Sequence, residues 1–178
     1  MMYQPAEDSE LLAKHLPRYV KGKSFLDMGT GSGIQAECAR KAGAASILAT
    51  DIDEDVLLHV QKKGFAVCKS NVFSAIKGVF EVIAFNPPYL PQDAREDAIS
   101  RRVTTGGMKG DELTLTFIKR LSSHLAPNGV ALLIVSSLTP HNRLEKTLHA
   151  QHFVKKVLEK QSFFMETLEL WELKRRSQ

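Results

Sequence analysis

The stretch SFLDMGTGSG, residues 24–33, decides the fold of this chain. Its first five residues, Ser24 to Met28, are mostly apolar and predict a buried β-strand. The three glycines that follow, Gly29, Gly31 and Gly33, are typical of a tight turn from a strand into a helix, where the backbone must come close to a ligand. We predict that helix from about Ile34 to near Gly43. Ligands of open α/β sheets bind at the carboxyl ends of the strands, so this turn is the first candidate binding element.

Outward from this unit, apolar strand-like runs alternate with helix-like stretches, which is the pattern of an α/β sheet. Beyond the first, we predict strands at 46–50, 65–68, 80–85, 130–135, 153–160 and 164–173. We predict three further helices. One begins at Asp53 and ends before Gly64, and a second begins at the capping residue Asp111 and ends at Pro127-Asn128-Gly129. The third spans 144–150. The 86–110 stretch between them is expected to be a long loop, and its position after a strand favours a functional role.

Composition excludes several classes of protein. The 178 residues are 43% hydrophobic and 25% charged, with two cysteines, six histidines and a net charge of +4. There is no membrane-length apolar run, signal peptide, disulfide framework or metal-ligand spacing, so we expect a single-domain cytoplasmic protein without a metal. The basic groups at 155–156 and 174–176 fit either a solvated surface or a surface that docks onto nucleic acid.

Asp27 narrows the class of cofactor. It stands two residues before the first glycine, where its carboxylate would repel a pyrophosphate. No Gly-Lys-Ser/Thr is present, so a P-loop is excluded. An acidic group at this position suits a phosphate-free cofactor with a cationic ammonium and sulfonium, which is S-adenosylmethionine.

Three residues after the next strands extend this prediction. Asp51 ends the second strand and would accept both ribose hydroxyls of the cofactor, while Ile52 would pack on the adenine. Asn71 follows the third strand and would hydrogen-bond the adenine edge. The structural alternatives are that Asp51 caps the following helix and that Asn71 is a turn residue.

The tetrad Asn86-Pro87-Pro88-Tyr89 ends the fourth strand. Its two prolines fix φ and supply no backbone donors, so carbonyl oxygens point in set directions. The Asn86 side-chain oxygen and the Pro87 carbonyl would accept both hydrogens of a planar –NH2 group and turn its lone pair toward a methyl donor. Tyr89 would supply an aromatic wall. Positioning and electrostatics then carry the reaction without a covalent intermediate or a metal, whereas the structural alternative is a rigid turn.

With these motifs, nearly the whole chain resembles class I S-adenosylmethionine-dependent methyltransferases, and more narrowly the HemK/PrmC family of N5-glutamine methyltransferases. That family methylates the Gly-Gly-Gln glutamine of release factors in translation termination. The resemblance implies a Rossmann-like, mostly parallel seven-stranded sheet with helices on both faces. It also implies a single domain over 1–178 whose residues 1–23 cover the cofactor. It rests on these segments: 27–33, 50–52, 71–73, 85–89, 3–9 and 106–112. It adds Asp8, Ser9, Gly29, Thr30, Gly31, Gly33, Val72 and Asn86 to the cofactor contacts.

The resemblance also bears on partners. Only about 23 residues precede the first strand, so we expect none of the helical N-terminal domain of bacterial members. The archaeal–eukaryotic branch lacks it too and often pairs with a small zinc-binding activator protein. Recognition would then fall to the 90–109 loop, with Arg101 and Arg102 as candidate contacts. The alternatives are an N6-adenine or related nucleic-acid amine methyltransferase, an enzyme acting on small-molecule amines, and a catalytically silent binding module. A histidine- or lysine-directed protein methyltransferase is less favoured, because the tetrad suits planar amines.

Overall fold

A computed structural model describes residues 7–88 and 110–177 of the chain. Seven strands within those ranges form one sheet in the order β3-β2-β1-β4-β5-β7-β6. The strands are β1 (Ser24–Met28), β2 (Ser46–Asp51), β3 (Ala66–Lys69), β4 (Phe80–Phe85), β5 (Leu125–Ser136), β6 (Phe153–Phe163) and β7 (Glu166–Arg175). The first five in spatial order pair in parallel, and β7 pairs antiparallel with both β5 and β6. The predicted α/β, Rossmann-like, mostly parallel seven-stranded sheet is confirmed.

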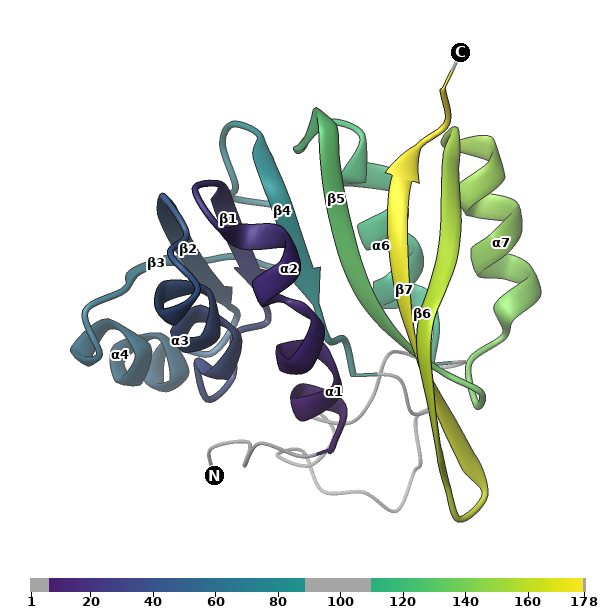
Figure 1. Cartoon of the computed structure of the whole chain (residues 1–178), viewed down its shortest axis with the longest axis horizontal. Helices are drawn as coiled ribbons and strands as arrows, with labels where there is room; N and C mark the ends of the chain where they lie inside the picture. Colours follow the sequence, from purple (N-terminus) through teal and green to yellow (C-terminus); the bar gives the residue numbers. More distant parts are fainter. Residues whose placement is uncertain (1–6, 89–109, 178) are drawn as a thin grey trace.

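Helices cover both faces of this sheet (Figure 1). They are α1 (Glu7–His15), α2 (Pro17–Val20), α3 (Ile34–Lys41), α4 (Glu54–Lys62), α6 (Glu112–Leu121) and α7 (His141–Ala150). Alternate strand residues divide between the faces because side chains along a strand point in opposite directions. Leu26 and Ile83 therefore lie in a core with α6 and α7, whereas Phe25 and Val82 lie in a core with α1, α2 and α3.

Two predictions about local structure were wrong, and two N-terminal helices had not been predicted. The N-terminal segment forms two helices, α1 and α2, which weak amphipathic patterning did not reveal. Pro127-Asn128-Gly129 does not end a helix; it lies inside β5, next to the irregular register between Phe80 and Val82. Phe164 is not in the last strand, which begins at Glu166, because Met165 takes a left-handed conformation (φ 66°) and turns the chain.

Candidate active site

The carboxyl ends of four neighbouring strands meet at one edge of the sheet. In the ladder, Met28 at the end of β1 pairs with Thr50 in β2 and with Phe85 in β4. Gly29 therefore leaves the sheet between Asp51 on one side and Asn86 on the other. Neighbouring strands lie about 4.8 Å apart, so Asp51 and Asn86 flank the glycine turn at roughly twice that spacing. The ends of strands far apart in sequence thus form one candidate site.

The glycine turn is built as the sequence predicts. Gly29, Gly31 and Gly33 all have positive φ values, of 64°, 51° and 82°. A Cβ at Gly33 would lie 3.3 Å from Val60 of α4, so both backbone angle and close packing select glycine there. The Thr30 N–H donates to the Thr50 carbonyl at 2.8 Å, which ties the turn to β2.

Asp27 is buried and stabilises the glycine turn through hydrogen bonds. Its Oδ2 accepts hydrogen bonds from the Thr30 hydroxyl at 2.7 Å and from the Ala36 N–H in the first turn of α3 at 3.1 Å. Burial raises its pKa from the ordinary value of 3.8 to about 6, although those two bonds act in the opposite direction. Asp27 therefore positions the glycine turn and places acidic character directly beneath it.

Asp51 is half-buried, and its two oxygens point to different backbone donors. Oδ2 accepts from the Gly31 N–H at 3.2 Å and Oδ1 from the Asp53 N–H at 3.1 Å. Burial raises its pKa, and these donors partly offset the effect. The helix cap is Asp53, which accepts from the Asp55 N–H at 2.9 Å. The alternative role of Asp51 as the cap of α4 is thereby excluded, and its neighbour Ile52 is 51% exposed at the same edge.

The turn after β3 brings Asn71 and Val72 beside Asp51. The Ser70 N–H donates to the Asp51 carbonyl at 2.9 Å, and the Ser70 hydroxyl donates to the Val72 carbonyl at 2.7 Å. Val72 is buried with φ at 51°, a left-handed conformation that a β-branched residue rarely adopts. Asn71 is exposed, with its N–H donating to the Ser74 hydroxyl at 3.1 Å. Ser70, which organises this turn, carries no motif of its own and was missed in the sequence.

Asn86 leaves β4 with an unused acceptor. Its Oδ1 is buried and has no hydrogen-bond partner among the described residues. Its Nδ2 lies 3.5 Å from the Ser9 hydroxyl, a long contact with α1. Pro87 follows it and is buried. Tyr89, Arg101 and Arg102 lie outside the described residues.

The N-terminal segment reaches this site. Asp8 and Ser9 are buried at the start of α1, where the Ser9 N–H donates to Asp8 Oδ1 at 2.7 Å. Gln35 of α3 donates from its Nε2 to the Ser9 carbonyl at 2.8 Å, and its own Oε1 is buried without a partner in the described part of the chain. Gln35 is a second functional candidate that sequence reasoning missed, because a single glutamine in a helix carries no pattern.

Asp111 has a different role from the predicted helix cap. It stands at the cap position of α6, but its side chain makes no cap hydrogen bond. Its fully buried Oδ1 accepts instead from Arg143 Nη1 of α7 at 2.8 Å. The Asp111–Arg143 pair therefore links the helix after the long loop to α7.

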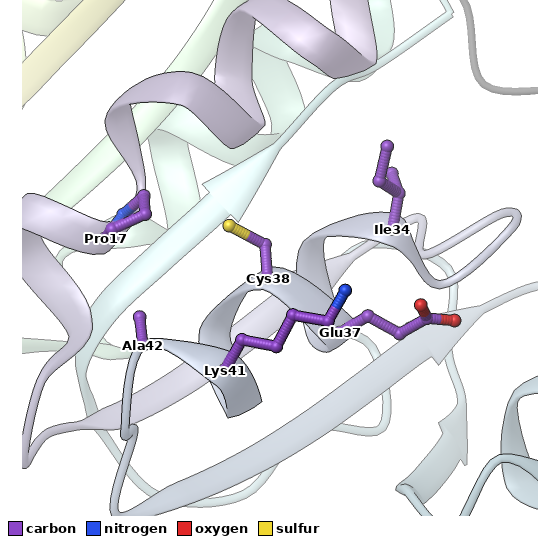
Figure 2. Close-up of a pocket in the computed structure, with 6 residues that line it drawn as sticks. All are labelled: Pro17, Ile34, Glu37, Cys38, Lys41 and Ala42. Atoms are coloured by element: carbon purple, nitrogen blue, oxygen red, sulfur yellow. The ribbon is translucent and has the colours of Figure 1, made fainter.

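A cavity of about 370 Å³ lies elsewhere, beside α3 and the start of α2 (Figure 2). It is lined by Pro17, Ile34, Glu37, Cys38, Lys41 and Ala42, and none of the predicted site residues takes part. No cluster of metal-ligating side chains occurs in the described ranges. Nor do those ranges hold a helix long and apolar enough to span a membrane.

Residues 5–164 match the methyltransferase small domain family, and the chain belongs to it. It is 36% identical over 146 residues to a Methanocaldococcus jannaschii protein assigned as a protein N5-glutamine methyltransferase, covering 78% of this chain and 74% of the relative.

Two solved structures show the same fold. One is the E. cuniculi Mtq2–Trm112 complex, responsible for methylating the eRF1 translation termination factor (TM-score 0.81, 23% identity, 98% of each chain covered). The other is a T. thermophilus 16S rRNA N2 G1207 methyltransferase in complex with AdoMet and guanosine (TM-score 0.68, 22% identity, 97% of this chain and 44% of that chain).

Proposed function

We propose that this chain is a protein methyltransferase that transfers a methyl group from S-adenosylmethionine to the side-chain amide nitrogen of glutamine, in the Gly-Gly-Gln motif of a translation release factor. The observation that carries this proposal is Asn86 Oδ1, a buried acceptor without a partner among the described residues, at the strand end beside the glycine turn. A buried acceptor left unpaired is costly, and a substrate amide would supply the donor that the described residues do not.

The residues around the glycine turn fit S-adenosylmethionine. Asp27 and Asp51 give the site two carboxylates, which matches a cofactor with a cationic centre and a ribose diol. Gly29, Thr30, Gly31 and Gly33 would lie along the cofactor chain. Ile52, Asn71 and Val72 would enclose the adenine, and Asp8 and Ser9 of the 1–23 segment would cover the pocket.

Asn86 would orient the substrate nitrogen. Its Oδ1, together with the Pro87 carbonyl, would accept both amide hydrogens and turn the nitrogen lone pair out of conjugation with the carbonyl. The aromatic ring of Tyr89 would pack against the planar amide. Bound S-adenosylmethionine supplies an electrophilic methyl on a sulfonium; the new N–C bond forms as the S–C bond breaks, and the nitrogen then loses a proton to solvent. S-adenosylhomocysteine is the second product.

The relatives support a release factor as the substrate, because a protein named for N5-glutamine methylation and an eRF1-methylating complex match this chain over most of its length. The Mtq2–Trm112 structure also supports a small activator protein as partner, and we infer that this partner binds zinc. We place the enzyme in the cytoplasm, where release factors act, and treat residues 1–178 as a single catalytic domain.

The test is methyl transfer from labelled S-adenosylmethionine to purified release factor, with and without the activator protein. A release factor in which Gly-Gly-Gln is changed to Gly-Gly-Ala is the matched control, and RNA is the comparison, because a base amine is also a planar –NH2 group. Methyl label in the wild-type release factor alone supports the proposal. Label in RNA, or equal label in the Ala control, contradicts it.

A further inference from the structure

Two neighbouring side chains are far more exposed than any other large apolar group in the described ranges. Phe164 is 94% exposed and Met165 82%, whereas the other five such residues lie between 43% and 58%. Single half-exposed apolar residues are ordinary on protein surfaces. It is unusual for an aromatic residue and a neighbouring methionine to be almost completely exposed. Both residue types are enriched at protein interfaces.

The turn that carries them is held in place by its flanks. The Ser136 hydroxyl donates to Glu166 at 2.6 Å, and the Ser137 N–H donates to the Thr167 carbonyl at 2.8 Å. Phe163 packs partly against the core. Met165 itself has a φ of 66°, a conformation that glycine adopts without strain, yet a large apolar side chain stands there. The turn thus presents Phe164 and Met165 on an anchored hairpin.

The hairpin turn lies at the same edge of the sheet as the candidate active site. Because β6 and β5 both run antiparallel to β7, β6 ends at the edge where β4 ends. Phe85 pairs with Leu133, and Ser136 pairs with Leu168. Met165 therefore stands about six residues beyond the level of Phe85, or roughly 20 Å along the strands. Figure 1 shows the hairpin projecting past the other strands.

We propose that Phe164 and Met165 are a docking contact for the folded release factor, outside the motif that is methylated. This rests on the proposed function and names how the substrate protein is held. A small molecule or a tripeptide at Asn86, which spans at most about 11 Å when extended, would not reach a contact roughly 20 Å beyond the strand end. The turn 162–167 carries one acid, Glu166, and no base, which disfavours both anionic lipid and nucleic acid.

The test compares wild type with the double variant Phe164→Ser/Met165→Ser. The matched control is Val79→Ser/Val154→Ser, which removes two exposed apolar side chains at the opposite edge. Each enzyme is assayed, with the activator protein present, on intact release factor and on the tripeptide Gly-Gly-Gln. We expect KM for the intact factor to rise about tenfold in the first variant. Its kcat, its activity on the peptide and its Tm should stay at wild-type values, as should all activities of the control.

The outcomes separate this inference from the proposed function. If wild type methylates neither substrate, the proposed function fails and this inference falls with it. If wild type is active and the first variant has an unchanged KM for the factor, only the docking contact is wrong. An equal loss of activity on the peptide and on the intact factor would also overturn the docking contact, because the turn would then act in catalysis or folding. So would sedimentation of wild type, but not of the variant, with phosphatidylcholine–phosphatidylglycerol vesicles.

Discussion

Ser9 and Asn86, 77 residues apart in sequence, meet at the candidate active site, where the Asn86 Nδ2 lies 3.5 Å from the Ser9 hydroxyl. This long contact connects α1 to the end of β4, where the Asn86 Oδ1 is buried with no partner among the described residues. The N-terminal helix therefore reaches the strand end that lies beside the glycine turn.

Replacing Asn86 by Ala should lower kcat by about 100-fold or more, because the transition state loses its positioned acceptor. The Kd for S-adenosylmethionine should change only a few-fold, and Tm should fall little. Ser9→Ala is the graded comparison: its 3.5 Å contact is long, so we expect a loss of only a few-fold in kcat. Near-normal turnover by Asn86→Ala would exclude the acceptor role.

Asp51→Ala should weaken S-adenosylmethionine binding by about 1.5–3 kcal/mol, through loss of a charged hydrogen-bond partner. Asp53→Ala is the matched control, because Asp53 is an acid two residues away that caps α4. It should lower the free energy of unfolding by about 1 kcal/mol and leave the affinity unchanged. Calorimetry and thermal denaturation on both variants separate the roles. Equal affinity losses would show that Asp51 acts only through the local fold.

Asp27 should make both stability and cofactor binding depend on pH. Its pKa is raised from 3.8 to about 6, so the fold holds a proton more tightly than the unfolded chain does. The stability of wild type relative to Asp27→Asn should therefore decrease as pH rises from about 4 to about 6, by up to about 3 kcal/mol, and stay level above that.

Cofactor affinity should change in the opposite direction. Protonation makes Asp27 neutral, so binding of a cationic cofactor should weaken as pH falls through about 6, and Asp27→Asn should remove this dependence. Denaturant titrations and calorimetry at matched pH values provide both measurements. If the stability difference between wild type and Asp27→Asn did not change between about pH 4 and pH 6, the pKa of the Asp27 carboxyl would not be raised by the fold.

Arg143→Met should lower the free energy of unfolding by about 1–3 kcal/mol, since it leaves the fully buried Asp111 carboxylate without its cation. The lower part of that range is expected because the Arg143 side chain is 44% exposed and screened by water. Adding Asp111→Asn to Arg143→Met should restore stability by removing the unpaired charge. A double-mutant cycle in denaturant gives the coupling, and a value near zero would show that the pair contributes nothing.

The sequence by itself determined the sheet and the outline of the site. Glycines at positions requiring positive φ, acids at two strand ends and the Asn-Pro-Pro-Tyr tetrad are local features, and their chemistry is set by residue type and spacing. Because parallel strands place their carboxyl ends at one edge, the alternation of strands and helices was enough to predict that Asp51, Asn71 and Asn86 would gather around the Gly29 turn.

Only the tertiary structure decided which atoms in that site are already paired. Asp27 is engaged with Thr30 and α3, whereas Asn86 keeps a buried oxygen without a partner in the described ranges. The link from Gln35 to Ser9 and the pair of Asp111 with Arg143 join residues that have no periodic relation in sequence. The exposure of Phe164 and Met165 depends on where the last hairpin turns. Such contacts arise from the packing of whole elements against one another, and a one-dimensional pattern does not encode them.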